Sequence, residues 1–191
     1  KAVKLYMDGA LGSRGALLSE PYSDRPDISG LEIAQEEPTL ALTKKAYEQN
    51  IQVCFHAIGD RGNQLVLDWM QKVFDAAPDK AVADKRWRIE HAQIVRLEDV
   101  VRFHDMGVIA SMQPSHAIGD LYFAPARIGP RRLLGGYAWR SLIDAGAIIA
   151  GGSDAPVEQG DPRIEFYAAV ARKDLQGKDG PDWHPEQAVT R

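Results

Sequence analysis

Four residues capable of metal or proton chemistry stand at or near the carboxyl ends of apolar, strand-like segments: Lys4, His56, His91 and Asp154. Imidazole nitrogens and carboxylate oxygens bind divalent metals such as zinc, and a carboxylate beside a metal-activated water can accept its proton. Helical patterns separate the segments, and strands that alternate with helices predict a parallel sheet. Because the carboxyl ends of parallel strands in a barrel meet at one mouth, we expect the four side chains to share one site.

Each of these residues also has a simpler interpretation. A histidine that ends a buried strand is often a core residue, but His91 repeats the placement of His56 one strand–helix unit later, and this repetition favours a metal. Asp154 follows four small residues, Ala150–Ser153, and could instead cap a helix. Lys4 could be a surface lysine; carboxylated by carbon dioxide, it would be an anionic ligand that bridges metal ions.

Three further residues are predicted to contact a substrate. His116 follows the strand that lies between those of His91 and Asp154, so it can reach the same mouth. Asp8 and Ser13 belong to the segment that leaves the first strand, and long loops in α/β proteins commonly form lids or binding loops. The only cysteine, Cys54, has no second cysteine at metal-binding spacing and is interpreted as a packing residue.

The elements that must position these residues can be read from the hydrophobic pattern. Helical spacing predicts helices over residues 39–50, 63–76 and 97–106, and the segments 9–30 and 114–136, which contain several prolines and glycines, are predicted to be irregular loops at the mouth. Five strands are expected, at residues 2–7, 51–56, 87–91, 108–113 and 147–152. Five are too few for a closed eight-stranded barrel. An open doubly wound sheet could use five, but the glycine-rich turn that typically follows its first strand is poorly matched at 8–15.

Composition narrows the class of partner. The chain has 191 residues, 45% of them hydrophobic, a net charge of −4 and one cysteine. These values predict one domain with a small-molecule substrate in the cytoplasm, without a disulfide framework. Basic side chains are scattered and no apolar run is long enough to span a membrane, so neither nucleic acid nor a membrane is an expected partner.

Four motifs together resemble the amidohydrolase superfamily, most closely its YtcJ-like branch of amidohydrolase 3 proteins. They are Val3–Arg14 (VKLYMDGALGSR), His56–Asp60 (HAIGD), Ile89–Gln93 (IEHAQ) and Gly152–Pro156 (GSDAP). The resemblance implies a metal-dependent hydrolase with a (β/α)8 barrel and a small flanking β-domain, acting mostly on amide and related carbon–nitrogen bonds. It also implies that Lys4, carboxylated, His56, His91 and Asp154 are ligands from the fourth, fifth, sixth and eighth strands, with Asp154 as the general base and one or two ions, zinc by preference.

One departure from the family pattern is informative. Family members carry a His-X-His pair on the first strand, and this sequence contains none. We therefore expect residues 1–191 to be the C-terminal part of a partial (β/α)8 barrel, about strands 4 to 8, without the first three strands and the flanking β-domain. The open edges at 2–7 and 147–152 would then favour association, including a homo-oligomer.

The sequence thus predicts part of a metal-dependent hydrolase acting on non-peptide carbon–nitrogen bonds through a metal-activated water. The alternative is a non-catalytic, degenerate barrel that serves as a binding or scaffold domain. A third interpretation, an open-sheet nucleotide-binding enzyme, lacks the glycine fingerprint.

Overall fold

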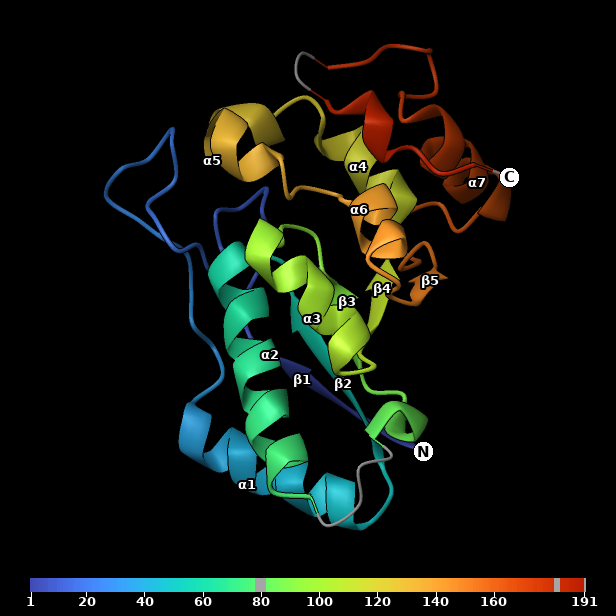
Figure 1. Cartoon of the computed structure of the whole chain (residues 1–191). Coiled ribbons are helices and arrows are strands. Elements are labelled where there is room, and N and C mark those ends of the chain that lie inside the picture. Colours follow the sequence, from blue (N-terminus) through green and yellow to red (C-terminus); the bar gives the residue numbers. More distant parts are fainter. Residues whose placement is uncertain (78–81, 181–182, 191) are drawn as a thin grey trace.

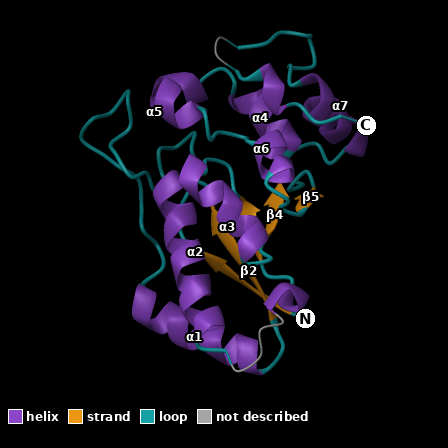
Figure 2. Ribbon diagram, viewed as in Figure 1, coloured by secondary structure: helices purple, strands orange, loops and turns teal. Residues whose placement is uncertain are grey.

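The centre of the molecule is a parallel sheet whose five strands follow their order in the sequence, β1-β2-β3-β4-β5 (Figure 2). The computed structural model describes residues 1–77, 82–180 and 183–190. The strands are β1 (Ala2–Tyr6), β2 (Gln52–Ala57), β3 (Arg88–His91), β4 (Ile109–Met112) and β5 (Ile149–Gly151). All five predicted strands are confirmed, and the fold is α/β.

The helices lie in two groups (Figure 1). Helices α1, α2 and α3 cover one face of the sheet, whereas α4 to α7 gather toward the carboxyl ends of β4 and β5. Their bounds are α1 (Glu36–Glu48), α2 (Asp60–Asp75), α3 (Val100–Asp105), α4 (Pro114–Asp120), α5 (Ala124–Leu133), α6 (Trp139–Asp144) and α7 (Pro162–Ala171), with short 3₁₀ segments at Val82–Lys85, Leu97–Asp99 and Pro185–Gln187.

The prediction that residues 114–136 are irregular is wrong, because this segment forms helices α4 and α5. Pro114 and Pro125 lie in the first turn of each helix, where a backbone N–H has no intrahelical partner and proline is therefore tolerated. The kink within α5 falls at Gly129, whose φ of 71° is non-helical, immediately before Pro130. Here proline marks where helices begin.

Helix α2 is fixed to the sheet by the apolar stripe that its spacing predicts. Trp69 packs against Phe55 of β2 with ring centroids 6.5 Å apart. Burying one such large side chain contributes about 1.5–3 kcal/mol to folding. The stripe residues buried in the core are Val66, Trp69, Met70, Val73 and Phe74, and Leu65 packs against them.

The loop over residues 9–30 is held onto the start of α2 by its backbone. The Leu17 carbonyl accepts hydrogen bonds from the backbone N–H groups of Arg61 and Gly62, each at 3.1 Å. Gly59 lies so close beneath this carbonyl that a Cβ there would be 1.9 Å from the oxygen. The loop is therefore packed directly on the junction between β2 and α2.

The sheet face opposite α1, α2 and α3 carries polar side chains. Phe55 and its alternate neighbours face the helices, so strand alternation places Lys4, His56 and Glu90 on the other face. At β1 this face is open, since Lys4 is exposed and Tyr6 is 54% exposed. This polar face contains the first candidate site residues.

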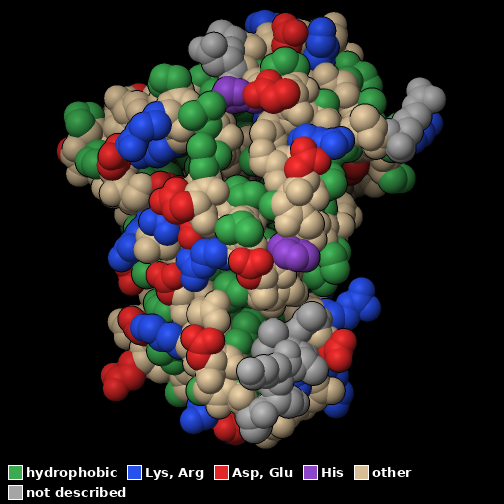
Figure 3. Space-filling model, viewed as in Figure 1, with side chains coloured by type: hydrophobic (Ala, Val, Ile, Leu, Met, Phe, Trp, Pro, Cys, Tyr) green, Lys and Arg blue, Asp and Glu red, His purple; other side chains and the backbone are tan. Residues whose placement is uncertain are grey.

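Charged side chains of both signs are mixed over the surface in the view of Figure 3, with no stripe of basic residues. Within 1–77, 82–180 and 183–190, no helix is both long and apolar enough to cross a bilayer.

Candidate metal and substrate site

Two histidines meet at the carboxyl ends of the adjacent strands β2 and β3. The rings of His56 and His91 are edge to face, with centroids 4.5 Å apart and planes 70° apart. Strict alternation would place His91 on the same face as Ile89, toward the helices. Its φ of 79° turns the backbone at the strand end, and a left-handed conformation at a non-glycine residue is typical of functional positions. Because of this turn, the side chains of His56 and His91 meet although strand alternation would place them on opposite faces of the sheet.

The protonated nitrogen of His91 is set by Gln113, which follows β4. The amide nitrogen of Gln113 donates to the Ser111 carbonyl at 3.2 Å, so its oxygen faces His91. That oxygen, 2.8 Å from Nδ1, can only accept, so Nδ1 carries the hydrogen. The Nε2 lone pair of His91 is then available to a metal, an arrangement usual for metal-binding histidines.

Both imidazoles are held in the neutral form that binds metals. Burial, followed by the neighbouring His56 and His116, lowers the pKa of His91 to about 3. Burial and the Lys4 ammonium also lower the pKa of His56, against a smaller opposing effect of a hydrogen bond with the backbone of Gly9. At neutral pH no proton has to leave either ring before a metal binds.

Asp8 lies next to His56, where its side chain is held by backbone hydrogen bonds. Its carboxylate is fully buried and accepts backbone N–H bonds from Leu17 at 2.9 Å, Ile58 at 3.0 Å and Gly59 at 2.8 Å. Burial raises the pKa of Asp8 to about 6, and these bonds oppose the rise. Its Oδ1 lies 3.6 Å from Nε2 of His56, a buried atom without a hydrogen-bond partner among the described residues. Asp8 thus holds in place the backbone that follows His56 and the loop that packs on it. Its contact with the substrate remains a prediction.

His116, on α4, extends the pair into a histidine cluster of His56, His91 and His116. Its ring stacks on that of His91, with centroids 5.7 Å apart and planes 20° apart. Its Nε2 is 3.7 Å from Oε1 of Glu158 and has no hydrogen-bond partner in the part of the chain that the structure describes. Ser13 lies elsewhere, exposed, and its hydroxyl donates to the Ala10 carbonyl. His116, predicted to contact the substrate, thus lies beside His91. Ser13, predicted to do the same, contacts neither His56 nor His91 in any described interaction.

Lys4 and Asp154 flank the pair less closely. Lys4 pairs in register with Cys54, two residues before His56, and its Nζ lies 5.4 Å from the centroid of the Tyr6 ring. Asp154 follows β5, is exposed and has a φ of 59°. Both lie within electrostatic range of His56, because the ammonium lowers its pKa and the carboxylate raises it.

The residues fit a divalent metal as a two-histidine half-site. His56 offers an unpartnered buried Nε2 and His91 a free Nε2 lone pair. Over residues 1–77, 82–180 and 183–190, no group of three or more His, Cys, Asp and Glu side chains is close enough to hold an ion. Lys4 and Asp154 therefore remain predicted ligands, and the two imidazoles are the donors that the fold brings together.

The sequence profile of the Amidohydrolase family, Amidohydro_3, matches residues 1–191, which is the whole chain. This chain belongs to the amidohydrolase family. Among curated relatives of this amidohydrolase chain, the Bacillus subtilis (strain 168) protein named "Putative amidohydrolase YtcJ" is 36% identical over 188 residues, covering 98% of this chain and 34% of the relative. The N-substituted formamide deformylase of Arthrobacter pascens is 29% identical over 190 residues, covering 99% and 33%. This amidohydrolase chain thus spans about a third of the length of the curated relatives it matches.

Solved structures agree with the family. An uncharacterized metal-dependent hydrolase from Pyrococcus horikoshii OT3 aligns with a TM-score of 0.82 at 34% identity, covering 98% of this amidohydrolase chain and 36% of that one. A second, from Pyrococcus furiosus, gives a TM-score of 0.82 at 30% identity with the same coverage. These likenesses support the α/β fold, and both of these related structures are named metal-dependent hydrolases.

Two residues beside the amidohydrolase histidines were not identified from the sequence. Gln113 fixes the tautomer of His91, and Glu158 faces His116. The signal for Gln113 was its place as the last residue of the predicted strand 108–113, at the strand end where the other candidate residues also stand. Glu158 gave no signal, because its approach to His116 depends on how α7 packs against α4.

Proposed function

We propose that this chain is part of a metal-dependent hydrolase that cleaves non-peptide, amide-type carbon–nitrogen bonds. The observation that carries the proposal is the pair of neutral imidazoles on adjacent strand ends, with the proton of His91 fixed on the nitrogen that faces Gln113. Family membership and the name of the deformylase relative, which acts on an N-substituted formamide, support the carbon–nitrogen bond class.

His56, His91, Asp154 and carboxylated Lys4 would hold one or two divalent ions, with zinc preferred by this set of nitrogen and oxygen donors. A bound ion would supply Lewis acidity, activating water and polarising the substrate carbonyl. Gln113 would keep the Nε2 lone pair of His91 free. Asp154 would accept the proton of the attacking water and deliver it to the leaving nitrogen as the carbon–nitrogen bond breaks.

The chain would contribute about strands 4 to 8 of a (β/α)8 barrel. Consecutive strand order without reversal, with α1, α2 and α3 on one face, is the arrangement of a barrel arc, whereas a doubly wound sheet reverses its strand order and carries helices on both faces. The polar face with Lys4, His56 and Glu90 would line the barrel interior near its mouth. The remaining strands and the flanking β-domain would come from other parts of the full-length protein.

Replacing Asp154 with Asn in the full-length protein tests the proton transfer. The amide cannot accept the proton, so turnover of amide substrates should fall by about 10³-fold or more, within the range that general-base catalysis and ligand geometry supply together. Most of the metal should remain, as measured by elemental analysis. Wild-type turnover in this variant would remove Asp154 from the mechanism.

A second variant tests the half-site directly. Changing both His56 and His91 to Ala should abolish stoichiometric zinc binding. The control is His104→Ala, which should leave zinc binding unchanged, because His104 is exposed and bonds only the Gly146 carbonyl among its described partners. Equal zinc content in the two proteins would leave the two imidazoles without a metal role.

A non-catalytic binding or scaffold domain is the second candidate, because no three-donor group occurs in the described ranges. It predicts that full-length protein loaded with zinc turns over no amide and that the histidine variants are unaltered in partner binding. A His-X-His pair after an apolar strand elsewhere in the full-length sequence would favour the enzyme.

A further inference from the structure

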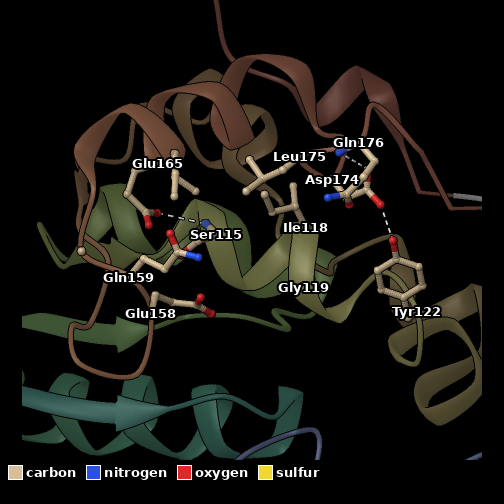
Figure 4. A pocket seen from close by; sticks show the side chains of 12 residues that line it. Ser115, Ile118, Gly119, Tyr122, Glu158, Gln159, Glu165, Asp174, Leu175 and Gln176 are labelled. Carbon is tan, nitrogen blue, oxygen red and sulfur yellow. Dashed lines mark hydrogen bonds between the residues drawn. The ribbon is translucent and has the colours of Figure 1, made fainter.

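A pocket of about 230 Å³ lies beside the histidine cluster, between α4 and the segment around α7. Ser115, Ile118 and Gly119 line it from a single face of α4, at helical spacing, and Tyr122 lines it just after the end of that helix. Figure 4 shows Ile118 and Leu175 in its middle, the hydrogen-bonded Glu165 and Ser115 at one end, and Tyr122 with Asp174 at the other. Its interior is therefore apolar and its two ends are polar.

The pocket adjoins the proposed reaction centre. Glu158, one of its lining residues, lies 3.7 Å from Nε2 of His116, and the ring of His116 stacks on His91. Ser115 is the neighbour of His116 in the chain. A group in the pocket would therefore belong to a molecule whose other end reaches the histidine cluster.

An unsatisfied hydroxyl points to a ligand. Ser115 is only 4% exposed, and its Oγ has no hydrogen-bond partner among the described residues, although the residue lines the pocket. Leaving a buried hydroxyl unpaired is costly, so such atoms usually have a partner. The backbone N–H of the same residue is already bonded to Glu165 at 2.9 Å, so the hydroxyl is the free group.

The charges of the lining select against ions. None of the lining residues that the structure describes is basic, so an anionic group would have no counter-charge. Three lining residues are acidic: Glu165 accepts the Ser115 N–H, Asp174 accepts the Tyr122 hydroxyl, and Glu158 faces Nε2 of His116, which leaves these carboxylates with less capacity for a cation. The volume exceeds the roughly 150 Å³ of an apolar cavity that holds benzene, so an alkyl or aryl group of six or so heavy atoms would fit.

We propose that this pocket is the subsite for an uncharged, mainly apolar substituent of the substrate, carrying one polar atom that bonds the Ser115 hydroxyl. The inference rests on the proposed function, since it names the substrate class of that same site. Substrates would then be amides with an alkyl or aryl substituent, not N-acyl amino acids or polyamine derivatives.

Binding of three matched probes to full-length protein tests the subsite without turnover. N-hexylacetamide is the neutral probe, and N-(5-carboxypentyl)acetamide and N-(5-aminopentyl)acetamide replace its terminal methyl with an anion and a cation. Calorimetry or ligand-observed NMR should show the neutral probe binding at least about tenfold more tightly than either charged one, because burying a charged end group without a counter-charge is costly. Equal or tighter binding of a charged probe, or no binding of the neutral one, would overturn the proposal.

Gly119 offers a matched pair of variants, because a Cβ there meets nothing within 4 Å. Gly119→Leu should fill the pocket and weaken the neutral probe by about tenfold or more, whereas Gly119→Ala, which makes the same backbone change, should bind it nearly as well as wild type. Ser115→Ala should weaken N-(5-hydroxypentyl)acetamide, which carries one polar atom in place of the terminal methyl, by about three- to tenfold through the lost hydrogen bond. The same variant should leave N-hexylacetamide, whose hexyl group has no polar atom, nearly unchanged. Unchanged affinity in Gly119→Leu, with an unchanged melting curve, would place the probe elsewhere.

These outcomes separate the two proposals. Loss of the subsite would appear in probe affinity while zinc content and Asp154-dependent turnover are unaffected. Failure of the hydrolase proposal would appear as the absence of amide turnover in zinc-loaded full-length protein, whatever the probes do.

Discussion

Gln113 controls His91 through one hydrogen bond. If its amide were absent, the imidazole could carry its proton on either nitrogen, and the molecules with the proton on Nε2 would offer no lone pair there to a metal. Ser111 takes part in this control because it orients the amide. The candidate site is therefore built from a predicted ligand, His91, its hydrogen-bond partner Gln113 and the residue that orients Gln113, all at strand ends.

Replacing Gln113 with Ala should weaken zinc binding to the full-length protein by about 10- to 100-fold, the usual cost of losing the partner of a metal-binding histidine. Competition with a chelator measures this change. Gln64→Ala is the control, since Gln64 is a partly buried amide on α2 that bonds Asp68. The same loss in both variants would mean that any removed amide weakens the site.

Asp8 predicts an effect on stability. An Asn there would bring an NH₂ group against a backbone N–H donor, leaving buried donors unpaired, so Asp8→Asn should lower the free energy of unfolding by about 1–3 kcal/mol. Urea denaturation of the purified chain measures it. Asp27→Asn, at an exposed pair with Arg25, is the control and should change it by less than about 1 kcal/mol. An unchanged free energy of unfolding in Asp8→Asn would contradict the proposal that Asp8 stabilises the region around His56.

At the scale of residues, the sequence identified the candidate residues but not the contacts and hydrogen bonds that they make. His56 and His91 were predicted as neighbours because consecutive parallel strands place their ends side by side. The turn at His91 and the orientation of Gln113 follow from backbone angles and a second-neighbour hydrogen bond, neither of which a residue pattern encodes. Asp8 was predicted as a substrate contact, and only its burial and three N–H partners reveal its structural position.

At the scale of elements, the spacing of hydrophobic residues was sufficient to predict the strands of the sheet and the helices that cover it. It failed over 114–136, where α4 and α5 are short and carry a proline in their first turn. Short helices at the carboxyl ends of strands are held by tertiary contacts, and α4 and α7 pack against each other. The pocket between them was for that reason invisible in the sequence.

The junction between β2 and α2 depends on Gly59. Gly59→Ala would force a Cβ to within 1.9 Å of the Leu17 carbonyl, so the loop over 9–30 must move, at a cost of about 3 kcal/mol. Thermal unfolding of the variant measures this cost. Gly151→Ala, where a Cβ meets nothing within 4 Å, is the matched control and should be close to neutral. Equal stability of the two variants would show that the loop yields without resistance.

At the scale of the molecule, both outer strands of the sheet lack a neighbouring strand among the described residues. Apolar side chains are exposed near them, with Tyr6 at 54% and Ile148 at 63%. Open edges with apolar surface favour pairing with another chain. The 191-residue chain by itself should therefore associate with itself.

Sedimentation velocity of the 191-residue chain should show its mean sedimentation coefficient rising with concentration. Ile148→Lys should reduce this rise, because a charge at an open edge opposes strand pairing. Leu97→Lys is the matched control, since Leu97 is 56% exposed but lies away from both edges on a 3₁₀ segment. A monomer at all concentrations would contradict the expectation that these edges are adhesive.

The histidine pair and the pocket stand on different parts of the chain. His56 and His91 end β2 and β3, whereas the pocket is lined by α4 and by residues that follow β5. Under the two proposals, reactivity and selectivity would be inherited separately: a lineage, or a mutant library confined to Ile118, Gly119, Ile164 and Leu175, would exchange one substrate for another without rebuilding the chemistry. Such a division would make this segment evolvable by small local steps.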